Sequence, residues 1–181
     1  FYQKFYNDNQ KRTFILGINP GRFGAGVTGV PFTDPIRLNQ LGIENSFPQK
    51  PELSSVFIYD MIVACGGPST FYQKYYITSL SPLGFVKGGK NYNYYDDPQL
   101  SQRVRPFIIS NIETQLKFGA DTSKVFCLGQ GKNFEYLSKL NDEYHWWERV
   151  IPLPHPRWVM QYRLKRKEEF VEEYKNVLMG L

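Results

Sequence analysis

The sequence predicts an α/β protein in which a central, mostly parallel sheet of four strands lies between two layers of helices. Short apolar segments alternate along the chain with segments whose apolar residues recur at helical spacing, which is typical of strands joined by crossover helices. The chain has 181 residues, close to the prior of about 150 residues for one domain, and a domain of this size holds a full core. We therefore expect a single domain over residues 1–181 that forms a three-layer α/β/α sandwich.

Four short segments are predicted to be the strands of that sheet. Each is apolar and bounded by turn or helix signals, and the first, Thr13–Ile18, is partly β-branched, as buried strands are. The expected strands cover residues 13–18, 75–80, 124–128 and 149–153. Ligands of parallel sheets bind beyond the carboxyl ends of the strands. The loops that follow Ile18 and Leu153 carry the most unusual residues, so we expect a site there.

The helices are predicted from proline at the first helical position, from capping residues and from apolar spacing. Asp34-Pro35 and Asp97-Pro98 each combine an N-cap side chain with proline, and Gly119 is suited to end the second of these helices. The expected helices run from 35 to about 41, from 51 through Met61, from 98 to 116, after Gly131 through Phe134 and Leu137, and from about 160 onwards. The longest irregular stretch is then 19–35, and loops of that length are usually functional.

Composition limits the classes of partner. Hydrophobic residues make up 41% and charged residues 22% of the chain, which argues against a disordered, collagen-like or coiled-coil protein. The net charge of +5 favours an anionic partner, nucleic acid first, and no apolar run approaches the roughly 18 residues of a membrane span. Cys65 and Cys127 lie in apolar runs, which predicts buried free thiols in a reducing compartment. With His145 and His155 they are too few and too badly spaced for a zinc site.

The loop after the first strand, Gly17-Ile-Asn-Pro-Gly-Arg-Phe-Gly-Ala-Gly-Val-Thr-Gly-Val-Pro-Phe32, could hold a ligand. Asn19 stands where the strand ends, Pro20 fixes the backbone there, and the glycines let backbone amides approach a water molecule, a carbonyl or a phosphate. The loop lacks the Gly-Lys-Ser/Thr ending of a P-loop and the glycine spacing of a dinucleotide fingerprint. The alternative is a long turn that merely requires glycine.

Three further features could carry chemistry. His155 lies between two prolines after the last strand, where an imidazole could donate a hydrogen bond to a developing anion or serve a structural role. Phe32 could stack on a planar ligand or belong to the core. A basic cluster near the last helix could contact nucleic-acid phosphates or form a solvated face balanced by nearby glutamates. This cluster comprises Arg157, Arg163, Lys165, Arg166 and Lys167.

The residues of these motifs resemble the uracil-DNA glycosylase superfamily, and within it the single-strand-selective monofunctional uracil-DNA glycosylases. Gly17–Phe32 looks like motif 1 of these enzymes, and His155-Pro-Arg157 looks like a shortened motif 2, where the family usually has His-Pro-Ser-Pro-Arg. The similarity runs in order along nearly the whole chain. Its other segments are Glu52-Leu-Ser54, Tyr76–Leu83, Gly89-Lys-Asn91 and Leu128–Gly131. This chain looks like a divergent bacterial branch of the subfamily.

The resemblance implies an enzyme that flips a damaged base out of DNA and cleaves its N-glycosidic bond without a lyase step, a metal or a cofactor. By the same resemblance Asn19 would position the attacking water and His155 would bind the carbonyl oxygen that gains charge. The other implied roles belong to the base pocket and to DNA contact. Ile18, Pro20, Gly21, Phe32 and Ser79 would bind the base, and Arg157, Arg163 and Lys165 would bind DNA, with Arg157 in the position of the family's wedge residue.

The chemistry of these side chains agrees with the implied reaction. Asn19 has no basic group, so it can orient water but cannot deprotonate it, which suits a dissociative transition state with cationic character on the sugar. Ser79 stands where the family's uracil-reading asparagine is expected. A hydroxyl can donate or accept by rotating. We therefore expect uracil to be the first substrate and xanthine or hypoxanthine the second.

The sequence thus predicts a monofunctional DNA glycosylase of base excision repair, acting on DNA with deaminated bases. A monomer in the bacterial cytoplasm, associated with the nucleoid and not with a membrane, is expected. One alternative is a glycosylase-like domain that binds nucleic acid without cleaving it, although a binder needs no water-positioning Asn19. Another is a small-molecule hydrolase, against which the basic surface and the absence of a nucleophile–base pair count.

Overall fold

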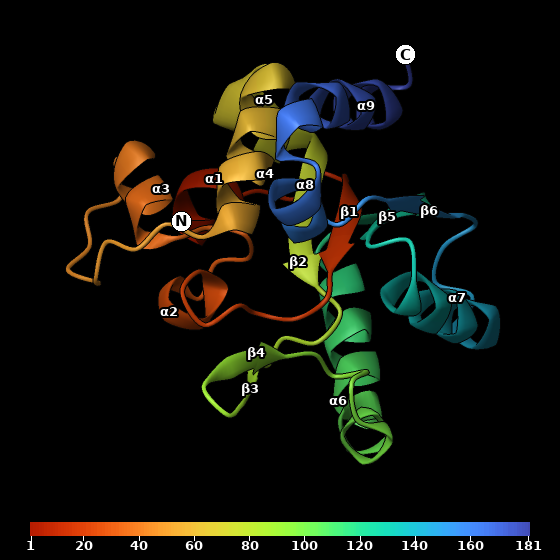
Figure 1. Ribbon diagram of the computed structural model, residues 1–181. Coiled ribbons are helices and arrows are strands. Elements are labelled where there is room, and N and C mark those ends of the chain that lie inside the picture. The colour runs from red at the N-terminus through yellow and green to blue at the C-terminus, as the bar shows by residue number, and fades with distance from the viewer.

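The computed structural model describes all residues from 1 to 181 and contains a parallel sheet of four strands in the order β2–β1–β5–β6 (Figure 1). Every neighbouring pair in this sheet is parallel. The strands are β1 (Arg12–Gly17), β2 (Tyr75–Ser79), β5 (Ala120–Leu128) and β6 (Val150–Leu153). The four predicted strands are therefore confirmed, and their carboxyl ends all lie at one edge of the sheet.

Helices cover both faces of the sheet (Figure 1), as the three-layer prediction required. Successive side chains of a strand point to opposite faces, and in β1 Ile15 belongs to one core cluster while Phe14 and Leu16 belong to the other. The first cluster is closed by α4 (Leu53–Ala64), α5 (Gly67–Lys74), α8 (Pro156–Tyr162) and α9 (Lys167–Met179), and the second by α6 (Pro98–Leu116) and α7 (Lys132–Tyr144).

Both predicted Asp-Pro helix starts are present. Asp34 caps α3 (Pro35–Gln40) by accepting a hydrogen bond from the backbone N–H of Arg37 at 2.9 Å, and Asp97 caps α6 in the same way. Asp34 is completely buried, and its second oxygen accepts the backbone N–H of Glu52 at 2.9 Å. This carboxylate therefore joins the end of the motif-1 loop to the start of α4.

The end of the chain differs from the prediction of one helix from about residue 160. Two helices, α8 and α9, are separated by the non-helical residue Arg163 and a 3₁₀ turn, η1 (Leu164–Arg166). The helix begins earlier than expected because His155 is an N-cap and Pro156 occupies the first helical position. This early start places His155 at the amino end of α8.

Several short elements lack a clear sequence pattern and were not predicted. The irregular stretch 19–35 contains α2 (Ala25–Thr28), and residues before the first strand form α1 (Tyr2–Phe5). Residues between β2 and α6 form an antiparallel hairpin of β3 (Phe85–Lys87) and β4 (Lys90–Tyr92). In Figure 1 this hairpin and α2 lie beyond the ends of the strands, on the side where the site is expected.

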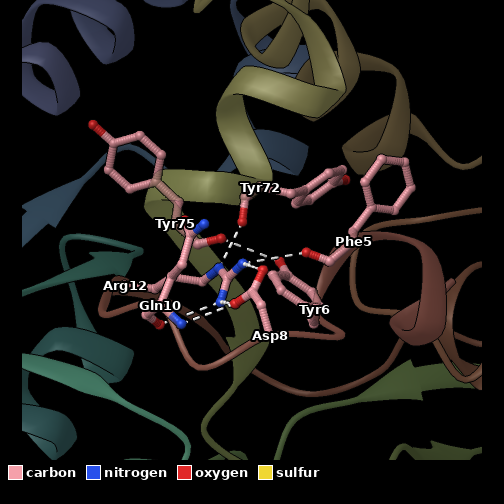
Figure 2. A network of polar contacts seen from close by, with 7 residues as sticks. All are labelled: Phe5, Tyr6, Asp8, Gln10, Arg12, Tyr72 and Tyr75. Carbon is pink, nitrogen blue, oxygen red and sulfur yellow. Dashed lines mark hydrogen bonds and ion pairs between the residues drawn. The ribbon is translucent and has the colours of Figure 1, made fainter.

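Arg12, at the amino end of β1, binds the N-terminal segment on the side of the sheet edge away from the expected site (Figure 2). Its guanidinium donates to Asp8 at 2.7 and 2.8 Å, to the Tyr72 carbonyl at 2.6 Å and to the Phe5 carbonyl at 3.3 Å, and it lies over the ring of Tyr6. The hydrogen bonds from Arg12 lower the pKa of Asp8 to about 2. This network holds the amino end of β1, whereas the loop at its carboxyl end faces the site.

Cys65 and Cys127 are buried free thiols, as expected. Burial raises the pKa of both, so neither is an activated thiolate. Every helix is too short or too polar to cross a bilayer.

Candidate active site

A cavity of about 880 Å³ opens at the carboxyl edge of the sheet, within the range of roughly 300–1,000 Å³ that ligand pockets occupy. Its wall comes from the loops after β1, β5 and β6, from the end of β2, and from the starts of α4 and α8. Eight of the ten predicted site residues line it: Ile18, Asn19, Pro20, Gly21, Phe32, Ser79, His155 and Arg157. The fold thus brings together residues that are up to 139 positions apart in the chain.

Asn19 is the second residue after β1, and its carboxamide is held by the backbone at the end of β4 and just after it. Its Nδ2 donates to the Tyr92 carbonyl at 3.2 Å, and its Oδ1 accepts the backbone N–H of Tyr94 at 3.3 Å. A carboxamide has two N–H donors and two lone pairs on its oxygen. Nδ2 also donates a long hydrogen bond to the Pro20 carbonyl at 3.5 Å. One lone pair of Oδ1 therefore has no protein partner and is available to a water molecule or a ligand.

His155 is fixed in position and in tautomer by its role as the N-cap of α8. Its Nδ1 accepts the backbone N–H of Arg157 at 3.1 Å, so the ring proton belongs on Nε2. Burial, reinforced by the Arg157 cation, lowers the pKa of His155 to about 4. The hydroxyl of Tyr174 donates to the carbonyl of Pro154, the residue before His155. At neutral pH the imidazole is therefore an uncharged Nε2–H donor on the cavity wall.

Phe32 packs its ring against the end of β1. It is one of two non-glycine residues with positive φ, at 54°, a conformation that costs on the order of 1 kcal/mol and needs support from its surroundings. A Cβ on Gly17 would come within 2.5 Å of the Phe32 ring, so only glycine leaves room for the ring at this point. Phe32 is partly buried against the core and also lines the cavity, so its ring is placed where a ligand could contact it.

Ser79 is the last residue of β2 and is paired in register with Gly17 of β1. It is only 5% exposed, and its hydroxyl makes no side-chain hydrogen bond within the protein although it lines the cavity. The Ser79 hydroxyl is therefore available to a ligand that enters the cavity beside Phe32.

Glu52, at the start of α4, is a cavity residue that we did not single out from the sequence beyond its place in the resemblance. Its carboxylate lies against the α-carbons of Gly21 and Gly24, where any side chain would overlap it. Burial raises the pKa of Glu52, the Arg157 cation opposes the increase, and Asp34 adds to it. The two glycines of motif 1 are thus needed because this carboxylate fills the concave side of the loop.

The remaining charged residues of the cavity are basic. Glu52 is the single acidic residue on its wall. The basic ones are Arg22, Lys90, Lys132 and Arg157. Three exposed aromatic rings also line it, Phe23, Trp158 and Tyr162. Such a mixture of cations and aromatic rings suits a strand of nucleic acid, whose backbone is anionic and whose bases stack.

Arg163 and Lys165 are the two predicted DNA-binding residues that do not line the cavity. Arg163 lies over the ring of Trp158, with 4.8 Å between its guanidinium carbon and the ring centroid, so it supports an aromatic residue that does line it. Lys165 is exposed on η1. Of the other basic residues in this cluster, Arg166 pairs with Glu169, and Lys167 pairs with Asp60.

Asn133 is a further cavity residue that sequence reasoning missed, and the buried Tyr94 is its partner behind the cavity wall. Asn133, the second residue of α7, lines the cavity and accepts a hydrogen bond from the Tyr94 hydroxyl at 2.9 Å. No local pattern in the sequence could have paired residues 39 positions apart. No three His, Cys, Asp or Glu side chains lie together as potential metal ligands.

Comparisons with known proteins bear on this geometry. The family model of the uracil DNA glycosylase superfamily matches residues 3–179. The single-strand selective monofunctional uracil-DNA glycosylase of Rattus norvegicus is 30% identical over 116 residues, which cover 54% of this chain and 42% of the rat protein. The match therefore spans less than half the length of that relative.

A solved structure resembles this chain over nearly all its length. The crystal structure of wild-type Pedobacter heparinus SMUG2 has a TM-score of 0.94 and 48% sequence identity, covering 99% of this chain and 80% of that one. The α/β/α prediction is thereby confirmed, and so is the resemblance carried by motifs 1 and 2. The chain belongs to the uracil DNA glycosylase superfamily.

Proposed function

We propose that this protein is a monofunctional DNA glycosylase that hydrolyses the N-glycosidic bond of a deaminated base, with uracil as the first substrate and xanthine or hypoxanthine as the second. The observation that carries the proposal is the placement of Asn19 and His155, from the exits of β1 and β6, in one cavity with Phe32. The family and the SMUG-like relatives support the same reaction.

Asn19 positions the attacking water in this proposal. The free lone pair of its Oδ1 can accept a hydrogen bond from a water molecule, while the backbone of Pro20, Tyr92 and Tyr94 prevents the carboxamide from rotating. An amide cannot accept the water proton. The bond to the base therefore breaks ahead of attack, its electron pair leaves with the base, and the sugar cation accepts a weak nucleophile. The proton of the added water is released to solvent.

His155 stabilises the leaving base. As the bond breaks, negative charge collects on the base and its carbonyl oxygens, and the Nε2–H of the neutral imidazole is ready to donate to one of them. A donor that is fixed before the charge develops requires no reorganisation and contributes about 3–4 kcal/mol to lowering the barrier. The hydrogen bond from Arg157 N fixes this donor.

Phe32 and Ser79 account for the choice of base. Phe32 stacks on the everted base, and the Ser79 hydroxyl donates or accepts according to the edge presented to it. A hydroxyl is shorter than a carboxamide, which leaves room in the cavity for a purine. The free energy needed to flip a base out of the duplex is lowest for a mispaired base, so deaminated bases are favoured before they contact the pocket. The Ile18, Pro20 and Gly21 backbone forms the wall of the base pocket, and Arg157 contacts the DNA beside it.

Cleavage of matched duplexes that contain uracil, xanthine, hypoxanthine or thymine tests the proposal. Alkali converts each abasic site into a strand break, which is measured on a denaturing gel. We expect breaks with uracil first and with the deaminated purines second, and at least a tenfold loss in Asn19→Ala with DNA binding retained. DNA binding without breaks at any base would instead support the non-catalytic alternative.

The proposal extends to where and how the protein acts. We expect a monomer that meets DNA in the bacterial cytoplasm, at the nucleoid, within base excision repair. Sedimentation of the free protein and of its complex with an abasic oligonucleotide would measure the number of chains per DNA. A stable dimer in both samples would contradict the monomer.

A further inference from the structure

We propose that Tyr94 and Asn133 are positioning residues that hold the carboxamide of Asn19 in its reactive orientation. This inference rests on the proposed function, because it assigns Asn19 to the water. The two residues belong to different elements, the turn after β4 and the start of α7. Together they connect the loop at the end of β1 to the end of β5.

The carboxamide of Asn19 depends on a backbone segment that is not itself part of the sheet. Its two shortest hydrogen bonds, to Tyr92 O and from Tyr94 N, come from the three residues that end β4 and follow it, and both are long, at 3.2 and 3.3 Å. The third, to the neighbouring Pro20 carbonyl, is longer still at 3.5 Å. Small movements of this segment would therefore break one bond or both. The orientation of Asn19 is only as precise as the anchoring of this segment.

Tyr94 is the anchor of that segment. Its side chain is fully buried, between the sheet and α7, with the ring of Tyr136 4.9 Å away. A phenylalanine would satisfy packing alone, yet Tyr94 carries a hydroxyl that donates to Asn133 Oδ1 at 2.9 Å. This hydrogen bond fixes the position and rotation of the Tyr94 ring. It thereby also fixes the position of the Tyr94 backbone N–H, which donates to Asn19 Oδ1.

Asn133 links Tyr94 to the next strand. It is 2% exposed, and its Nδ2 donates to the Leu128 carbonyl at 3.2 Å and contacts Cys127 Sγ at 3.3 Å. Cys127 pairs with Leu16 in the sheet, so both ends of this connection rest on neighbouring strands. The bridge from Asn19 through Tyr94 and Asn133 to Leu128 therefore closes on the same rigid sheet.

The same bridge reaches the surroundings of His155. Gly129, immediately after β5, donates its N–H to the Leu153 carbonyl at 2.8 Å. A Cβ on Gly129 would lie 3.4 Å from the Cβ of Asn133 and 3.9 Å from His155 Cδ2. Gly129 therefore lies between Asn133 and the imidazole of His155, and Asn133 packs against it. The bridge holds Asn19 relative to the strand end beside which His155 lies.

Single-turnover cleavage of a uracil-containing duplex tests this role, with the Tyr94→Phe variant compared with Tyr136→Phe. Tyr136 belongs to the same aromatic cluster, but its hydroxyl makes no hydrogen bond to Asn133. We expect Tyr94→Phe to lower the cleavage rate constant about tenfold or more, because catalysis is sensitive to displacements of about 1 Å, with KM changed less than twofold. Tyr136→Phe should stay within about twofold of the wild type in both.

A cycle with Asn19→Ala separates positioning from general loss of structure. If Tyr94 acts through Asn19, Tyr94→Phe should not slow cleavage further once the carboxamide is absent, since coupled residues are non-additive. Equal losses in the wild-type and Asn19→Ala backgrounds would overturn the proposal. Asn133→Ala, which leaves the Tyr94 side chain intact, should give the same loss and the same non-additivity, and it replaces Tyr94→Phe if that variant does not fold.

The outcomes distinguish this inference from the proposed function. If Asn19→Ala is impaired but Tyr94→Phe and Asn133→Ala cleave at the wild-type rate, the positioning role is wrong and the function stands. If the wild type cleaves no base, or Asn19→Ala is as fast as the wild type, the function or the role of Asn19 is wrong, and the positioning role fails with it.

Discussion

His155→Asn is the substitution that isolates the anion-stabilising role of the imidazole from its structural role. His155 performs two tasks: its Nδ1 caps α8 through Arg157 N, and its Nε2–H faces the cavity. Asparagine is among the best N-cap residues, so it can replace the cap, but its shorter side chain places no donor where Nε2–H was. Stability should therefore change little while catalysis is lost.

The expected loss follows from the state of the imidazole. With a pKa of about 4, His155 is neutral at pH 7 and acts as one fixed neutral donor. Removal of one such donor to a developing oxyanion raises the barrier by about 3–4 kcal/mol, or roughly a hundredfold to a thousandfold in rate. The assay is single-turnover release of uracil at pH 7, together with urea unfolding of each variant.

The pH dependence adds an independent check. Because His155 does not titrate between pH 5.5 and 8, the ratio of the wild-type rate to the His155→Asn rate should stay constant over that range. A loss in rate of less than about fivefold, close to 1 kcal/mol, would show that the imidazole is structural. A ratio that changes steeply around pH 6.5 would show that the histidine titrates and that the neutral donor is wrong.

Four other substitutions or conditions test the rest of the site and its frame. Gly17→Ala should push the Phe32 ring into the cavity and lower kcat/KM on uracil DNA about tenfold, with about 1–3 kcal/mol of stability lost to overpacking. Ser79→Asn should shift the xanthine-to-uracil cleavage ratio toward uracil, and an unchanged ratio would mean that Ser79 does not read the base. Asp34→Ala should cost about 3 kcal/mol in urea unfolding, because the buried backbone N–H groups that it binds lose their acceptor. Lowering the pH from 6.5 to 4 should destabilise the wild type more than His155→Asn in the same measurement, because the unfolded chain gains a proton at residue 155 that the folded chain excludes.

The local features of the fold could be predicted because they depend on neighbouring residues. The four strands are apolar runs. Each of the caps at Asp34 and Asp97 is set by the aspartate side chain and the proline that directly follows it. The short elements were not predicted, because their local sequence carries no such signal. The strands of the hairpin β3–β4 have only three residues each, too few for an alternating pattern to mark them. Helix α8 starts early through a His155 cap, and standard capping preferences do not include histidine.

The candidate catalytic groups were also visible in the sequence, because Asn19 and His155 each stand at the exit of a strand in a loop of distinctive residues. Parallel strands open at one edge of the sheet, so residues at two such exits can meet there. The sequence alone therefore determined the fold class, the family resemblance and the two groups to test.

Only the tertiary structure decided what surrounds those groups. It placed the Glu52 carboxylate against Gly21 and Gly24, and it paired Asn19 with Tyr94 across 75 positions. It also buried His155 enough to keep the imidazole neutral. Such contacts join residues that are remote in the chain, and their geometry depends on how whole elements pack. Burial and charge environment are set by that packing, so no local pattern of residues contains them.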